Sequence, residues 1–159
     1  MELLQIFQNR RSVRQYTDAP IPEETLTKIL QAGLLSASGK AIRPWEFIVV
    51  RNRETLNALA GCRTTPVKML QEAACAIVVL GDESKSDVWV EDCSVAMANM
   101  HLMADALGVG SCWVQGRLRE ASDGQTSEAF VRNLLGFPQE MRLQAILTLG
   151  MPAKHPAPH

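Results

Sequence analysis

Hydrophobic positions along the chain follow helical spacing in some stretches and extended spacing in others. The stretch after Pro22 is the clearest helix, because proline suits a first helical turn and the two glutamates that follow favour the positive end of the helix dipole. Apolar residues then recur every three or four positions. The predicted buried stripe consists of Leu26, Ile29, Leu30, Gly33 and Leu34.

Apolar runs rich in β-branched and aromatic residues predict strands, and the run at 74–80 has the continuous apolar character of a strand covered on both faces. Strands are expected at 45–51, 74–80, 109–114 and 143–149, and further helices at 1–9, 52–60, 66–72, 88–107 and 127–135. A chain of 159 residues fits one core, so we expect one domain, 1–159, of a layered α/β (α+β) class with four or five strands.

The helix at 88–107 carries small residues and methionines around nearly its whole circumference. A helix that is apolar on every side is buried on every side. One small domain offers too little cover for it, so we expect it to pack against a second copy of the chain.

Composition and charge argue against nucleic-acid binding, a membrane span and a metal site. The formal net charge is −1, which gives no electrostatic case for nucleic acid. No apolar run reaches the roughly 20 residues of a membrane helix, and the first residues reverse the charge order of a secretory signal, so a cytoplasmic protein without a membrane partner is expected. The four cysteines lack CxxC spacing, so no metal site is predicted.

The segment Arg10-Arg11-Ser12-Val13-Arg14 is the first candidate for chemistry. Guanidinium groups bind phosphate through paired hydrogen bonds, and in an extended loop Arg10, Ser12 and Arg14 would point the same way. This pattern favours a phosphate clamp; a solvated basic loop is the alternative.

Two further segments can approach a flat ligand. Ser36–Lys40 combines small hydroxyl residues with Gly39, and the predicted strand at 109–114 leads into Gln115-Gly116, where backbone N–H groups could be free for a ligand. Each also has an ordinary explanation as a turn or a strand end. His101, in the middle of the long helix, is expected to be a hydrogen-bonded core or interface histidine.

In this order, the Arg-Arg-Ser-x-Arg start, the serine-rich loop before Pro-Trp-Glu-Phe, the small-residue helix and Gly-x-Gly-Ser-Cys-Trp resemble the FMN-dependent nitroreductase-like oxidoreductases, in particular their short members. The resemblance implies a homodimer whose subunits each have a central mixed sheet flanked by helices. Carried over by position, it places Arg10, Arg11, Ser12, Arg14, Ala37, Ser38, Lys40, Lys68, Gln115 and Gly116 around FMN.

The resemblance also implies a role for each segment. The opening motif holds the phosphate and ribityl chain, and Ala37, Ser38 and Lys40 reach the flavin of the other subunit. Lys68 lies near the flavin pyrimidine, and Gln115-Gly116 faces N5 and O4. The sequence departs from the family at Ala41, where an asparagine is common. At the C-terminal end only Lys154 and His155 are available to add positive charge to the phosphate site.

The implied function is passage of hydride from NAD(P)H through FMN to a nitroaromatic or quinone by a ping-pong mechanism. No catalytic side chain is assigned, because the flavin carries the chemistry. Two alternatives stay open. One is other flavin chemistry on the same scaffold, such as reductive dehalogenation or flavin breakdown, and the other is a non-enzymatic flavin-binding redox module.

Overall fold

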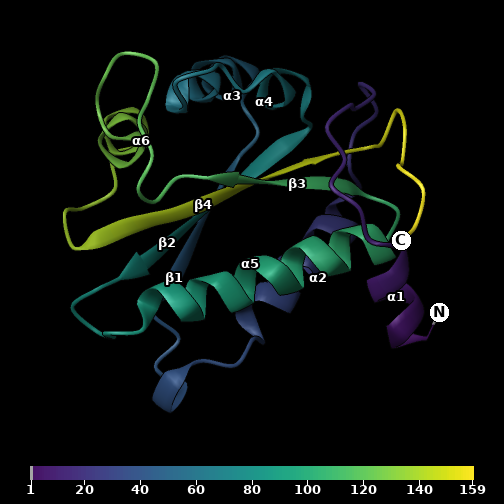
Figure 1. Ribbon diagram of the computed structural model, residues 1–159, viewed down its shortest axis with the longest axis horizontal. Helices are drawn as coiled ribbons and strands as arrows, with labels where there is room; N and C mark the ends of the chain where they lie inside the picture. The colour runs from purple at the N-terminus through teal and green to yellow at the C-terminus, as the bar shows by residue number, and fades with distance from the viewer. Residues whose placement is uncertain (1) are drawn as a thin grey trace.

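The computed structural model describes residues 2–159 and contains one four-stranded sheet with the order β1-β2-β4-β3 (Figure 1). Its strands are β1 (Trp45–Val50), β2 (Cys75–Asp82), β3 (Gly110–Gln115) and β4 (Met141–Gly150). All three neighbouring pairs are antiparallel. The expected mixed sheet is therefore wrong for the chain, although the number and approximate positions of the strands are confirmed.

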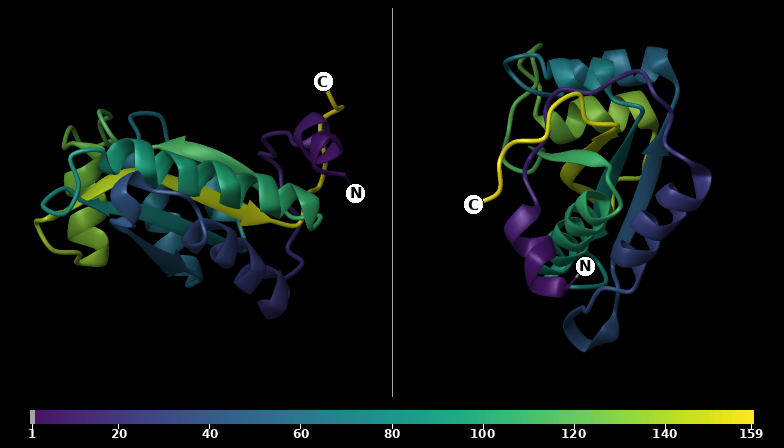
Figure 2. Two further views of the ribbon diagram at one scale, coloured as in Figure 1. Left: turned by 90° about the horizontal axis from the view of Figure 1, so that it is seen from below. Right: turned by 90° about the vertical axis from the view of Figure 1, so that its right-hand side faces the viewer.

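Helices cover both faces of the sheet, so the molecule has three layers (Figures 1 and 2). Helices α2 and α5 lie on one face, and α3, α4 and α6 lie on the other. The helices are α1 (Leu3–Asn9), α2 (Glu23–Leu34), α3 (Arg53–Leu59), α4 (Lys68–Glu72), α5 (Trp89–Ala106) and α6 (Ser127–Leu135), and the short 3-10 turns are η1 (Gly39–Ala41) and η2 (Ala60–Cys62).

Local signals set several helix ends. The Asn52 side chain accepts a hydrogen bond from the Thr55 N–H and caps α3, as its position predicts. Gly136, with φ of 79°, closes α6 in the left-handed region that glycine adopts without strain. Pro22 precedes the first residue of α2, so this helix begins where the sequence indicates.

Strand β2 is buried along its whole length, as expected of a strand covered on both faces. Ile77 and Val79 face the α2/α5 layer, and Val78 and Leu80 face the opposite layer. Alternate side chains of one strand thus divide the apolar residues between two cores.

A bulge interrupts β4 at Gln144. Val79 pairs with Ala145 and Leu80 pairs with Leu143, so Gln144 has no partner on β2. The extra residue turns Leu143 toward the face that Ile146 occupies. The carbonyl of Gln144 also accepts the N–H groups of Gly116 and Arg117, which fixes the turn after β3.

Helix α5 is not buried on every side within one chain. Met97 and Met100 are fully buried in the α2/α5 core, whereas Val95 is 42% exposed and Ala98 is exposed. The stripe predicted for α2 also needs one correction, because Leu34 is 52% exposed. No helix within residues 2–159 is long and apolar enough to cross a membrane.

Candidate functional site

The arginine loop, residues 10–14, lies along the free edge of β3. Ser12 forms a parallel bridge with Ser111, and the Val13 N–H donates to the Ser111 carbonyl at 2.9 Å. Val13 is fully buried, and the Tyr16 hydroxyl bonds to the Val13 carbonyl at 2.7 Å and to Thr148 Oγ1 at 2.6 Å. Burial and backbone pairing therefore fix the loop within the chain.

Ser12 and Arg14 line one cavity of about 230 Å³ together with Gln15, Lys154 and Pro156. The cavity thus lies between residues from opposite ends of the chain whose side chains carry a hydroxyl, a guanidinium and an ammonium group. These donors match the charge and the acceptor oxygens of a phosphate group. The residues present therefore fit the phosphate end of FMN.

Arg10 turns away from this cavity toward α5. Its guanidinium donates to His101 Nε2 at 3.0 Å, and His101 Nδ1 lies 2.5 Å from Ser111 Oγ. Burial and the nearby charge of Arg10 lower the pKa of His101 to about 4, so the imidazole is neutral and accepts from Arg10. The expectation that three side chains point the same way holds for Ser12 and Arg14 only, and the expected hydrogen-bonded core histidine is confirmed.

The C-terminal segment runs beside the arginine loop (Figure 1). The Ala153 N–H donates to the Gln15 carbonyl at 2.9 Å, and His155 Nε2 lies 2.6 Å from Asp105 Oδ1. The hydrogen bond to Asp105 raises the pKa of His155. Arg11 pairs with His159 at 2.6 Å rather than entering the cavity. These contacts hold Lys154 beside Ser12 and Arg14.

At the other end of β3, polar groups bond to one another. Gln115 Oε1 accepts from Trp113 Nε1 at 2.8 Å, and the Gly116 N–H donates to the Gln144 carbonyl at 3.3 Å. The free N–H expected at Gly116 is therefore wrong for the single chain. Arg63, which the sequence reasoning missed because it lies in an ordinary polar turn, donates to the Gln115 carbonyl at 3.3 Å.

Lys68 is the exposed first residue of α4, and its neighbour Met69 packs against Val13 and Tyr16. Lys68 therefore belongs to a helix that touches the arginine loop. The segments around Arg14, Lys68 and Gln115 all lie beside β3 or its neighbours, although they are far apart in sequence.

The serine-rich loop lies elsewhere, with η1 away from the arginine loop (Figures 1 and 2). The Gly39 N–H donates to the buried Asp92 at 2.9 Å, and Ser38 Oγ accepts the Arg43 N–H at 2.9 Å. Ala37 and Lys40 are exposed. The chain alone therefore does not bring Ala37, Ser38 and Lys40 to the other predicted site residues.

The pattern of the Nitroreductase family matches residues 7–151. The chain belongs to the Nitroreductase family. A curated protein of Archaeoglobus fulgidus, provisionally named NADH dehydrogenase/NAD(P)H nitroreductase, is 40% identical over 155 residues, which cover 95% of this chain and 86% of the relative.

Solved structures of nitroreductases share the fold. An FMN-dependent nitroreductase from Clostridium difficile R20291 aligns with a TM-score of 0.95 and 38% identity, covering 99% of this chain and 91% of that one. A protein from Desulfovibrio desulfuricans, provisionally described as a nitroreductase and solved in complex with FMN, aligns with a TM-score of 0.82 and 26% identity over 100% of this chain and 91% of its own. The antiparallel sheet found here is thus the sheet of a nitroreductase-family fold.

All four cysteines of this nitroreductase-family chain are buried and free. Within residues 2–159, no group of three or more histidine, cysteine or acidic side chains is arranged to hold a metal ion.

Proposed function

We propose that this nitroreductase-family chain is an FMN-dependent oxidoreductase that passes reducing equivalents from NAD(P)H to an electron-poor acceptor such as a nitroaromatic or a quinone. The observation that carries the proposal is the cavity that Ser12, Arg14 and Lys154 share at the edge of β3. The family match and the relatives described as FMN-dependent or as NAD(P)H nitroreductases support it. The proposed cofactor domain spans 1–159.

In this proposal, the residues along β3 contact different parts of FMN. Ser12, Arg14 and Lys154 hold the phosphate, and Arg10, held by His101, adds positive charge beside it. Lys68 and Arg63 supply positive charge near the pyrimidine, where negative charge develops on reduction. Gln115-Gly116 faces the ring edge. FMN, when bound, supplies the two-electron transfer, and the chain supplies position and electrostatics.

We further propose that a second copy of the chain completes the site with Ala37, Ser38 and Lys40. Two observations support a homodimer. The end of the serine-rich loop and the residues just after it contain three non-glycine residues in the left-handed region, Lys40, Ala41 and Arg43, with φ between 51° and 55°. Large apolar side chains are also exposed on α1, on α5 and after α2: Leu3, Leu4, Leu35 and Val95.

The test is spectroscopic and kinetic. The purified protein should show a flavin absorption band, and NADH or NADPH should bleach it in the absence of oxygen. If donor and acceptor use one pocket in turn, reciprocal plots at different acceptor concentrations should be parallel. A protein that takes up no FMN, or whose flavin neither nucleotide reduces, would contradict the proposed function, and intersecting lines would contradict the shared pocket.

A further inference from the structure

A second cavity, of about 270 Å³, opens where β3 ends, and Gly116 forms part of its wall. Its lining carries an unusual density of charge. Arg117, Arg119, Arg142, Glu83 and Glu128 all contribute to it. The Gly116 position is where the proposed function places the flavin ring edge, so this cavity would adjoin the reacting end of the cofactor.

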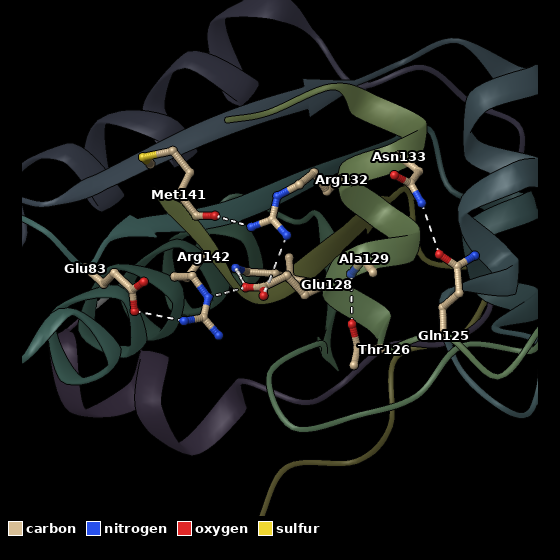
Figure 3. Close-up of polar contacts among 10 residues, drawn as sticks. Glu83, Gln125, Thr126, Glu128, Ala129, Arg132, Asn133, Met141 and Arg142 are labelled. Carbon is tan, nitrogen blue, oxygen red and sulfur yellow. Dashed lines mark hydrogen bonds and ion pairs between the residues drawn. The ribbon is translucent and has the colours of Figure 1, made fainter. Parts of the chain in front are cut away.

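The acidic side chains of the cavity are already neutralised (Figure 3). Glu128 pairs with Arg142 at 2.8 Å and with Arg132 at 3.8 Å, and it also accepts the Leu143 N–H at 2.8 Å. Glu83 pairs with Arg142 at 2.8 Å. Both glutamates are thus paired with Arg142 or Arg132, so neither is left to neutralise a further cation.

Arg117 and Arg119 are the cations that remain. Within residues 2–159, no carboxylate lies within ion-pair distance of either guanidinium. Arg117 lies over the Trp89 ring, 5.9 Å from its centroid, and Arg119 donates to the Leu118 carbonyl at 3.1 Å. The cavity wall therefore carries two positive charges with no negative partner.

The backbone holds both arginines in place. The Arg117 N–H donates to the carbonyl of the bulge residue Gln144 at 3.1 Å, and the Arg117 carbonyl accepts from Gln115 Nε2 at 3.0 Å. The Arg119 carbonyl accepts the Ser127 N–H at 2.9 Å. Between them the exposed Leu118 has φ of 59°, in the left-handed region that bulky residues rarely adopt. The two guanidinium groups thus extend from a turn whose backbone is hydrogen-bonded within the chain.

We propose that this cavity binds an anionic group, a carboxylate, sulfonate or phosphate monoester, of the molecule that exchanges electrons with the flavin. Arg117, stacked on Trp89, would provide the main contact, and Arg119 would add charge at the rim. The inference rests on the proposed function. The anion has two possible sources, an acidic substituent on the acceptor and the 2′-phosphate of NADPH, and the test separates them.

Calorimetric titration of the oxidised FMN-loaded protein measures this binding without turnover. For the donor, 2′,5′-ADP is compared with 5′-AMP; for the acceptor, 4-nitrobenzoate is compared with 4-nitrobenzamide. In one of the two pairs, the ligand with the extra anionic group should bind at least about tenfold more tightly, as one charge-assisted contact provides. Arg117→Gln should remove that preference, Arg119→Gln should reduce it about threefold, and Arg117→Lys should restore part of it.

Arg51→Gln is the matched control, because it removes the same charge from an exposed arginine paired with Glu23, which does not line the cavity. Loss of the preference for 2′,5′-ADP identifies the donor phosphate, and loss of the preference for 4-nitrobenzoate identifies the acceptor. Equal binding within both pairs, or a preference that survives in both Arg117→Gln and Arg119→Gln, would overturn the inference. Should Arg117→Gln not fold, the binding preference of Arg119→Gln, a variant at an exposed position, is the test. Flavin that neither nucleotide reduces would instead overturn the proposed function.

Discussion

The arginine loop and the serine-rich loop differ in how the chain supports them. The arginine loop buries Val13 completely, pairs with the edge of β3 and holds Arg10 against a neutral histidine. The serine-rich loop is hydrogen-bonded to α5 through Asp92, yet three non-glycine residues at its end and just after it have positive φ, and Ala37 and Lys40 are exposed.

The two loops therefore differ in whether contacts within one chain account for their conformation. Non-glycine residues in sparsely populated backbone regions cost about 1–3 kcal/mol each, and such strain gathers at binding sites. Within the described chain, this turn is held by the hydrogen bond from the Arg43 N–H to Ser38 Oγ, and the side chains of Ala37 and Lys40 stay exposed, where a second copy seated on α5 could contact them. Under the proposed function, the arginine loop is the part of the flavin site that forms within one chain, and the serine-rich loop is the part that a second copy completes.

The largest effect is expected from Val95→Glu on the outward face of α5. Val95 is 42% exposed in the single chain, so the variant should fold, but a dimer would bury an unpaired carboxylate at a cost of about 3–5 kcal/mol. Sedimentation read at protein and flavin wavelengths should show a monomer that has lost FMN. Leu134→Glu, at a comparably exposed position on the opposite layer, is the control. A Val95→Glu dimer with full flavin content would place the interface elsewhere.

The pH dependence of stability tests the contact between neutral His101 and Arg10 of the arginine loop. The pKa of His101 falls from an ordinary 6.5 to about 4, so the unfolded imidazole takes up a proton before the folded one does. The contribution of neutral His101 to the free energy of unfolding is therefore fully present above about pH 6.5. It falls by up to about 3 kcal/mol as the pH approaches 4. Urea unfolding at both pH values should show that His101→Gln lacks this component and that His159→Gln, at an exposed histidine, retains it. Equal pH dependence in wild type and His101→Gln would contradict the buried neutral imidazole.

Arg14→Ala tests the phosphate end directly. Loss of a charge-assisted contact should weaken FMN binding by about 1.5–3 kcal/mol, and riboflavin, which lacks the phosphate, should bind as before. Fluorescence titration of the apoprotein measures both ligands. Arg51→Ala serves as the control for charge. If FMN and riboflavin lost affinity equally, Arg14 would not contact the phosphate.

The smallest effect is expected at His155. Its pKa is raised by Asp105, so the pair is present at low pH and is lost as the pH rises through the raised value, above about 6.5. His155 is 36% exposed, so the pair contributes less than about 1 kcal/mol. Trypsin should cleave after Lys154 faster as the pH rises, relative to a peptide of the same sequence. The Asp105→Asn variant should be cleaved fast at every pH. A cleavage rate in wild type that follows the peptide at every pH would contradict the stabilising role of the His155–Asp105 pair.

The sequence predicted the elements better than their assembly. Asn52, Pro22 and Gly136 mark helix ends through local chemistry, so those boundaries could be placed before the structure was known. The bulge at Gln144 could not, because one extra residue inside an apolar strand leaves no sequence signal. The antiparallel pairing of β1, β2 and β4 likewise depends on contacts between distant residues, and the expectation of a mixed sheet failed there.

For the candidate site too, the sequence indicated the residue types but not how they are arranged. The residue types in Arg10–Arg14 indicated phosphate chemistry, and two of its side chains share a cavity. That Arg10 would turn to His101, and that Lys154 would fold back beside Arg14, depend on tertiary packing across more than 90 residues. Arg63 and Arg117 carried no motif, and only their places at the end of β3 distinguish them.

A mixed dimer tests the division between the two loops most directly. Arg14→Ala damages the arginine loop, and Ala37→Trp places a bulky side chain on the exposed serine-rich loop. If the site is shared, a dimer with one copy of each variant contains one undamaged site, because the intact arginine loop of one chain meets the intact serine-rich loop of the other. Such a purified mixed dimer should bind one FMN with wild-type affinity, although neither parent homodimer does. A mixed dimer that binds FMN no better than its parents would show that each chain builds its site alone.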